Sequence, residues 1–318
     1  MIKLIQNEWI KIMKRPGTIV MIALVILIVG ATGAFMKYNQ DKYEKSADQN
    51  WKKSLQVETA GYKKELEENG DKKNPAKSYL ERNIAINEYR MKHDISPHEK
   101  TSVWTFVDTS SGSIILVGLF TIIVAANIVA SEFNWGTIKL LLIRPFSRKK
   151  IILSKYITSI LFGFVLLFTL FFVSILLGLA LFGTGDGNTS YLAYVDGHVE
   201  EQSRLIYMAK MYLMSFIETF MLATMAFMIS TVFRNNTFAI GLSILLLTIG
   251  SIITNIVASY FDWAKFILFA NTDLMQYING TPLVEGMTMT FSIIMLLVYF
   301  VIFLALALVV FSKRDVAA

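Results

Sequence analysis

The sequence contains no cysteine, few histidines and few charged side chains. Without cysteine, this chain has no disulfide framework, no thiolate nucleophile and no cysteine-ligated zinc. The only histidines are His93, His98 and His198. Charged residues make up 17% of the 318 residues and hydrophobic residues 54%, whereas soluble domains contain about 25% charged residues. This composition is typical of a membrane protein.

Motifs that carry chemistry are also missing. There is no Gly-x-x-x-x-Gly-Lys-Ser/Thr phosphate loop, no His-Glu-x-x-His and no Gly-x-Ser-x-Gly. Residues 183–186 match the Gly-x-Gly-Asp pattern of some intramembrane aspartyl proteases, but they lie in an expected external turn and no second intramembrane aspartate accompanies them. We therefore expect no enzyme activity, catalytic residue, metal or cofactor in this chain. The net charge of +6 does not point to a nucleic-acid partner here, because in a membrane protein the placement of charges matters more than their sum.

Long apolar runs are abundant. A membrane span needs about 20 mostly apolar residues, and six runs qualify: 18–36, 112–130, 151–183, 205–233, 237–260 and 289–311. A signal peptide cleaved near 31–33 is the alternative for the first run. A span is favoured there, because the run exceeds the usual 7–15 residues and follows a 17-residue leader.

The distribution of basic residues predicts the orientation. With the N-terminus inside, the cytoplasmic segments hold 13 Lys or Arg against three acidic residues. These segments are 1–17, 131–150, the 234–236 connection and the tail 312–318, and the count also includes Lys155 near the start of the third span. The short external loops, 184–204 and 261–288, are acidic. We predict an all-α, multi-pass protein of the bacterial cell membrane, in contact with membrane lipids and with both termini in the cytoplasm.

The segment 37–111 is a polar insertion between the first two spans. It holds 14 Lys or Arg and 13 Asp or Glu. An apolar stripe at helical spacing precedes a breaker at 70–75, which predicts an extracellular helical hairpin; the stripe consists of Trp51, Leu55, Tyr62 and Leu66. The other long external segment, 261–288, is predicted as a loop, with a short re-entrant helix near 274–277 as the alternative.

The N-terminal leader, 1–17, is predicted to be an amphipathic helix lying in the cytoplasmic membrane interface. One face carries Ile2, Ile5, Trp9 and Ile12, and the other carries Lys3, Asn7, Lys11 and Lys14. Two interpretations remain open: the helix is an orientation signal only, or it is a lever tied to the first span.

The segment after the second span has an unusual arrangement of helix breakers and caps. Gly136 breaks the preceding helix, Thr137 can cap a short apolar helix, and Pro145 ends that helix. Arg148 and the two lysines after it then stand in the first turn of the third span, where the helix dipole disfavours cations. An anionic membrane surface would explain the charges. A cytoplasmic protein partner would also explain the short apolar helix.

This segment resembles the loop between the second and third spans of ABC-2 type transporter permeases. The residues that carry the resemblance are Glu132, Gly136, Thr137, Leu141, Leu142, Pro145 and Arg148. The resemblance implies that 137–148 forms a coupling helix that docks on a separate ATPase subunit, which would bind ATP and Mg. It also implies a second permease subunit, identical or not. With its large 37–111 insertion, the chain resembles Gram-positive members of the family that act on peptide antibiotics more than it resembles the compact polysaccharide or drug exporters.

Glu218 is a carboxylate near the middle of the fourth span, where its charge costs about 3 kcal/mol or more. It lies in a seam of methionines at helical spacing, which includes Met214, Met221 and Met225. Methionine suits surfaces that accept varied apolar shapes. The seam therefore indicates either a substrate pathway or a helix-packing interface.

Three functions are compatible with these features. The leading hypothesis is the permease subunit of an ATP-driven exporter for an amphiphilic substrate, such as a peptide antibiotic, a hydrophobic drug or a lipid-like molecule. The second is an ion- or proton-coupled transporter that uses Glu218, although no helix repeat or broken-helix pair is evident. The third is a membrane sensor or assembly factor that uses the 37–111 insertion.

Overall fold

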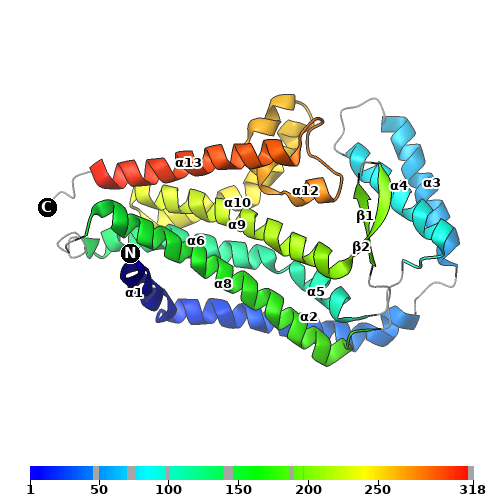
Figure 1. Cartoon of the computed structure of the whole chain (residues 1–318), viewed down its shortest axis with the longest axis horizontal. Coiled ribbons are helices and arrows are strands. Elements are labelled where there is room, and N and C mark those ends of the chain that lie inside the picture. The colour runs from blue at the N-terminus through cyan, green and yellow to red at the C-terminus, as the bar shows by residue number, and fades with distance from the viewer. Residues whose placement is uncertain are drawn as a thin grey trace.

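The computed structural model describes residues 1–45, 50–69, 76–97, 101–138, 146–185, 190–195 and 197–313. In these ranges the chain forms an elongated bundle of long helices, with a smaller group of helices and strands at one end (Figure 1).

Within the described ranges, six helices of the bundle are long and apolar enough to cross a membrane, as predicted. Each overlaps one predicted span, and their ends differ from the prediction by a few residues. They are α2 (Pro16–Lys45), α6 (Ile114–Asn134), α8 (Arg148–Phe182), α9 (Arg204–Phe233), α10 (Asn236–Ala258) and α13 (Met289–Lys313). The largest difference is at the end of α2, whose apolar spanning part ends at Gln40.

The two central helices of the bundle are α6 and α9. In the most apolar stretch of each of these two helices more than half of the residues are buried, whereas few are buried in the corresponding stretches of α2, α10 and α13. The backbone N–H of Ala130 on α6 donates to the Ser230 hydroxyl of α9 at 3.1 Å. Helix α8 also packs closely on α6, since a Cβ on Gly163 would lie 2.6 Å from Cγ2 of Thr121. Small residues at such contacts are typical of helix packing in membranes.

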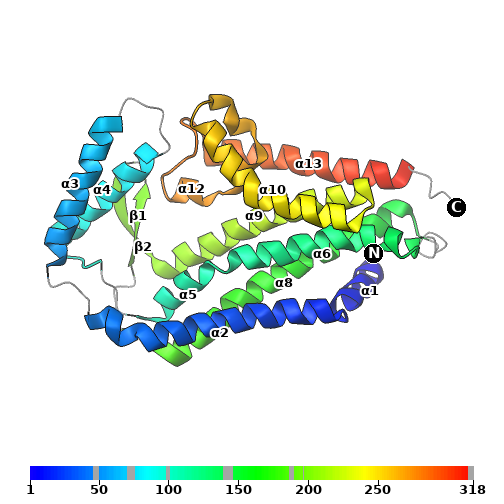
Figure 2. The same ribbon diagram turned by 180° about the vertical axis from the view of Figure 1, so that it is seen from behind.

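One end of the bundle gathers the chain's N-terminal helix, α1 (Ile2–Met13), and the last turn of α13 (Figures 1 and 2). The end of α6 and the start of α8 lie at the same end. We call it the terminal end. The expected amphipathic helix is present, and it packs against α8 more extensively than against α2. Placement of this end in the cytoplasm stays a prediction.

The opposite end, which we call the distal end, carries the 37–111 insertion. Helices α3 (Trp51–Asn69) and α4 (Ala76–His93) pack against each other, and α5 (Val103–Ser111) leads into the bundle. Helix α5 was not predicted as a separate element.

A β-hairpin at the distal end corrects the all-α expectation for the 184–204 loop. Strands β1 (Ser190–Val195) and β2 (His198–Ser203) are antiparallel, with Tyr191 opposite Gln202. The Asp-Gly pair at 196–197 is a strong hairpin signal in the sequence, and Gly197 has a φ of +85°. This small sheet packs against α4 and the start of α9.

The segment between α10 and α13 folds into three short helical pieces, η1 (Asp262–Phe266), α11 (Leu268–Thr272) and α12 (Met275–Ile278). Hydrogen bonds hold it together: the Gln276 amide donates to the Ala270 carbonyl at 2.9 Å and accepts from the Leu283 N–H at 2.8 Å. The Ser292 hydroxyl of α13 donates to the Asn271 side chain at 2.6 Å. The short helix α12 falls where the re-entrant alternative placed one; its depth in a membrane stays a prediction.

Candidate functional site: a buried ion cluster at the terminal end

A buried lysine joins three helices at the terminal end. Lys155, in the second turn of α8, is only 1% exposed. Its Nζ donates to Glu8 Oε2 on α1 at 2.7 Å and to Glu132 Oε1 on α6 at 2.8 Å. The N-terminal helix is thereby tied to the helices that bracket the 139–145 segment.

A second lysine balances the charge of this group. Lys11, one turn after Glu8 on α1, places Nζ 3.0 Å from Glu8 Oε1 and 3.4 Å from Glu132 Oε1. The hydroxyl of Thr137 donates to the other oxygen of Glu132. Two carboxylates and two ammonium groups therefore form one neutral cluster, which we call the ion cluster: Glu8, Lys11, Glu132, Thr137 and Lys155.

The local sequence explains how the ion cluster forms. On α1, Glu8 and Ile12 lie one turn apart and are both buried, so this face of the helix packs on the bundle. Glu132 stands in the last turn of α6, and Gly136, with a φ of +67°, turns the chain so that Thr137 comes back to it. A buried charge is costly unless it is paired and hydrogen-bonded. The four charges in this cluster meet that condition inside the chain.

The cluster can fix a position, and it offers little for chemistry. Both carboxylates are already held by ammonium groups, so neither is available as a general base. What the arrangement does is to lock α1, the end of α6 and the start of α8 together.

The structure brings some of the predicted coupling residues into this cluster and places others beside it. Glu132 and Thr137 are members, and Gly136 forms the turn between them. Arg148 begins α8, and its guanidinium donates to the Ser312 carbonyl at the end of α13, 3.3 Å away. Leu141, Leu142 and Pro145 lie outside the described residues.

Three members, Glu8, Lys11 and Lys155, were not predicted as site residues from the sequence. Lys11 was placed only on the polar face of the leader, and Lys155 lies within the predicted third span, where the structure encloses it in protein. Two signals pointed to Glu8 and Lys155: Glu8 is an acid in a basic leader, and Lys155 lies inside an apolar run.

The predicted pathway seam lies on α9 and shares no residue with the ion cluster. Met221 and Met225 are buried in the core, and Met214 is half-buried. Glu218 is half-buried, and among the described residues its carboxylate has no hydrogen bond or ion pair. It interacts electrostatically with Asp273, before α12. The Asp273 side chain is exposed, but neighbouring protein atoms remove part of its hydration and so raise its pKa above the ordinary value, while the N–H groups of Met275 and Gln276 act in the other direction.

Comparison with known proteins places the chain in a family. The model of a family described as a protein of unknown function, DUF2705, matches residues 80–317, well over half of the chain. The chain belongs to the DUF2705 family. The matched region contains all of the bundle after α2, including Glu132 and Lys155 but not Glu8.

Two relatives of this DUF2705 member come from Bacillus subtilis strain 168. The chain is 51% identical over 320 residues to the uncharacterized protein YhcI, and the alignment covers both chains in full. It is 34% identical over 204 residues to the uncharacterized membrane protein YdbK, covering 64% of this chain and 78% of the relative. The second relative is named a membrane protein, which agrees with the six apolar helices of this chain.

Proposed function

We propose that this chain is the membrane-spanning subunit of an ATP-driven exporter of the ABC-2 type. The observation that carries the proposal is the ion cluster, which ties α1 to both helix ends that flank the 139–145 segment. In an exporter without its own phosphate loop, force has to enter from a separate ATPase. The ion cluster holds together the end of α6, the start of α8 and helix α1. The loop between α6 and α8 is therefore suited to receive that force.

In this proposal the coupling segment 137–148 docks on the ATPase, which hydrolyses ATP with Mg, and displaces α6, α8 and α1 as one unit. The spans then alternate between inward and outward access in the bacterial cell membrane. A second permease subunit completes the assembly. The apolar outer faces of α10 and α13 suit contact with lipid, and the substrate is an amphiphile such as a peptide antibiotic, a hydrophobic drug or a lipid-like molecule.

The test is co-purification from the native membrane in a mild detergent, followed by mass spectrometry for a subunit with a phosphate-loop ATPase sequence. The wild-type chain is expected to retain such a subunit. A variant with residues 138–143 replaced by Gly and Ser is expected to lose it, while K63Q in α3 at the distal end keeps it. If the wild type brings down no ATPase, or if the loop variant retains the subunit, the proposal is wrong.

A second candidate, a proton- or ion-coupled transporter, is favoured by one observation. Glu218 is a carboxylate in a spanning helix with no cation beside it among the described residues, and a second carboxylate, Asp273, lies close enough to act on it. In a resistance or efflux assay, E218Q is expected to alter transport of cationic compounds and to leave neutral ones unchanged if this carboxylate lines the pathway. Equal transport of both classes would assign Glu218 to helix packing.

A further inference from the structure

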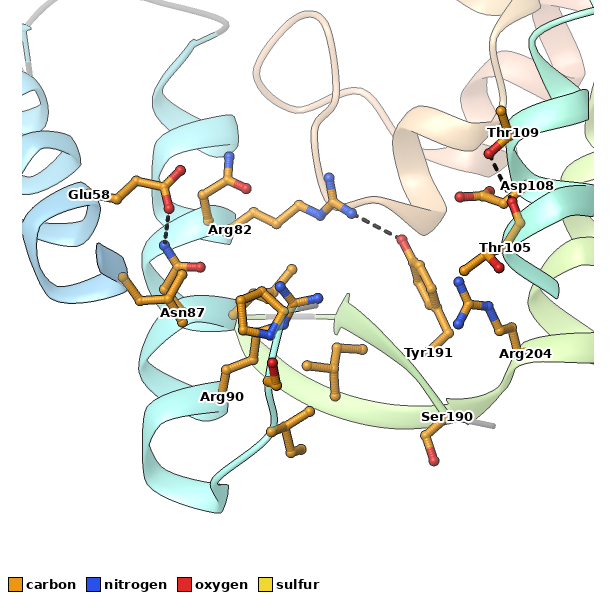
Figure 3. Close-up of a pocket in the computed structure, with 17 residues that line it drawn as sticks. Glu58, Arg82, Asn87, Arg90, Thr105, Asp108, Thr109, Ser190, Tyr191 and Arg204 are labelled. Carbon is orange, nitrogen blue, oxygen red and sulfur yellow. Dashed lines mark hydrogen bonds between the residues drawn. The ribbon is translucent and has the colours of Figure 1, made fainter. Parts of the chain in front are cut away.

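A cavity of about 590 Å³ lies at the distal end, between the insertion and the bundle (Figure 3). Its walls come from α3 and α4 of the insertion, the residues just after α4, α5, the first strand of the hairpin and the start of α9. Ligand sites of proteins commonly have volumes of about 300–1,000 Å³ and form where two structural units meet. The cavity has both properties.

Three arginines line this cavity. Arg82 and Arg90 project from α4, and Arg204 is the first residue of α9. Arg90 and Arg204 have interactions within the chain. Two acidic residues, Glu58 and Asp108, also line the cavity, so its walls carry one more cation than anions.

Arg82 has spare capacity for a ligand. Its Nη2 donates to the Tyr191 hydroxyl at 3.0 Å, and Figure 3 shows its side chain reaching from α4 across the cavity to that phenol. Its Nε is buried and has no hydrogen-bond partner among the described residues, and no carboxylate there lies within ion-pair distance of its guanidinium. A guanidinium has five N–H donors in a planar fork that fits a carboxylate or phosphate. The Arg82 guanidinium faces the phenol of Tyr191 and the space of the cavity.

The acids of the cavity are already engaged. The Glu58 carboxylate accepts from the Tyr62 hydroxyl at 2.7 Å and from the Asn87 amide at 3.4 Å. The hydrogen bond and charge of Glu58 raise the pKa of Tyr62 to about 12, so this phenol stays a donor at neutral pH. Asp108 also has an interaction within the chain. Neither carboxylate neutralises Arg82.

Other parts of the cavity wall are apolar. Leu55 and Leu192 are buried, and Ile86 and Ile95 are half-buried. The ring of Tyr191 stacks on Tyr207 of α9 with centroids 3.5 Å apart, which fixes the phenol that meets Arg82. A ligand that satisfies both kinds of wall carries an anionic group and an apolar part.

We propose that this cavity binds an amphiphile through its phosphate or carboxylate group, which Arg82 holds with its free N–H donors while the apolar part lies along the leucines and isoleucines. The anionic group is found both on lipid headgroups and on soluble anions. The proposal goes beyond the exporter function and does not depend on it, because binding at the distal end requires no ATPase.

The test is isothermal titration of the full chain, purified in an uncharged detergent, with three probes. Dihexanoyl phosphatidic acid carries a phosphate and short apolar chains, inorganic phosphate carries the anion alone, and dihexanoyl phosphatidylcholine has the same chains with its charge neutralised. The variants are R82Q, R82K and, as a matched control, K53Q, which removes one exposed cation from α3 of the same insertion. Melting temperature by tryptophan fluorescence reports whether each variant is folded.

The short-chain phosphatidic acid is expected to bind the wild type, and R82Q is expected to weaken this binding about tenfold. K53Q leaves the affinity within about twofold of wild type, and R82K, which keeps the charge but loses the planar fork, falls between. Stronger binding of phosphatidic acid than of inorganic phosphate indicates a lipid-like ligand. Equal binding of the two indicates a soluble anion and removes the role of the apolar wall.

Three results would overturn the proposal: no binding of either phosphate probe to the folded wild type, equal affinity of R82Q and wild type, or an equal loss in K53Q. If R82Q does not fold, R82K decides: an affinity equal to that of wild type, for both phosphate probes, counts against the site.

Discussion

The two ends of the bundle handle buried charge in opposite ways. At the terminal end, Lys155 is almost fully buried and is held directly by Glu8 and Glu132. At the distal end, Arg82 is half-buried and faces a cavity, and its one hydrogen-bond partner among the described residues is the phenol of Tyr191. A charge satisfied within the chain fixes helices, whereas a charge left open to a cavity is available to a ligand. The exporter proposal rests on the first pattern, and the proposed ligand site rests on the second.

A third group of charges lies between these ends. Glu218 of α9 and Asp273, just before α12, are two carboxylates that interact electrostatically, and among the described residues neither forms an ion pair with a cation. They represent neither a satisfied cluster nor an open cationic cavity. Substitutions in the three groups are therefore expected to have different effects on stability.

The largest effect is expected for K155M. This change removes one of the two ammonium groups of the ion cluster, the one that is fully enclosed, and leaves Glu8 and Glu132 buried with Lys11 as their remaining cation. Removing one partner of a buried ion pair costs about 3–5 kcal/mol. The melting temperature of the purified protein, followed by tryptophan fluorescence, should fall by several degrees.

The matched control is K11M on the same cluster. The Lys11 side chain is 36% exposed, and one of its two contacts is long at 3.4 Å. Its loss should cost about 1 kcal/mol or less, as for other exposed ion pairs. An equal fall in melting temperature for K11M and K155M would contradict the view that Lys155 contributes most to the stability of the cluster.

A smaller effect on stability is expected for R82Q. Arg82 makes one hydrogen bond, to the neutral phenol of Tyr191, and its side chain is half-buried, so the substitution should cost about 1.5 kcal/mol, the lower end of the range for a charged donor. The melting temperature should change little while ligand binding falls, which is the reverse of K155M. Unfolding of R82Q comparable to that of K155M would make Arg82 a structural residue and erase the contrast between the two ends.

The smallest effect, and one of opposite sign, is expected for D273N. The raised pKa of Asp273 means that the folded protein binds this proton more tightly than the unfolded chain, so stability is lost as pH rises above the unfolded pKa. An asparagine keeps the acceptor for the Met275 N–H, which is 2.9 Å away in the wild type, and carries no charge.

D273N should therefore melt slightly above wild type near pH 7, and the difference should shrink as pH falls toward about 4. E285Q, which removes an exposed acid from the same segment, should show no such trend. A difference for D273N that grows at acid pH would reverse the assigned sign.

Much of the bundle could be predicted from hydropathy, because each apolar run is a local property of about 20 residues. The amphipathic pattern of 2–13 and the helical pattern of the insertion were also local. The hairpin at 190–203 was missed although its Asp-Gly turn is local, because the surrounding residues were classed as loop between two strong spans.

The sites were harder to predict because they are made by residues far apart in the chain. Lys155 meets Glu8 across 147 positions, and Arg82 meets Tyr191 across 109. A lysine near the start of a span has the same sequence signature whether it reaches toward lipid headgroups or turns into a bundle. Only the packing of α1 on α8 distinguishes the two. The predicted coupling residues Glu132 and Thr137 lie within the ion cluster, while its other partners depended on that packing.

Helix α8 gives these two ends a common mechanical element. It runs unbroken for 35 residues, about 52 Å at the usual helical rise, which exceeds the roughly 30 Å of a hydrocarbon core. Near the start of α8, Lys155 is held by ion pairs to α1 and α6. At the other end of α8, Gly178 packs on Phe106, and the Gly183 carbonyl accepts a hydrogen bond from the Val103 N–H. Phe106 and Val103 belong to α5, which lines the cavity. A tilt of about 5° at the clamp moves the far end of such a strut by roughly 3 Å. In the proposed exporter, force applied at the terminal end would be transmitted along α8 to the proposed binding cavity at the distal end.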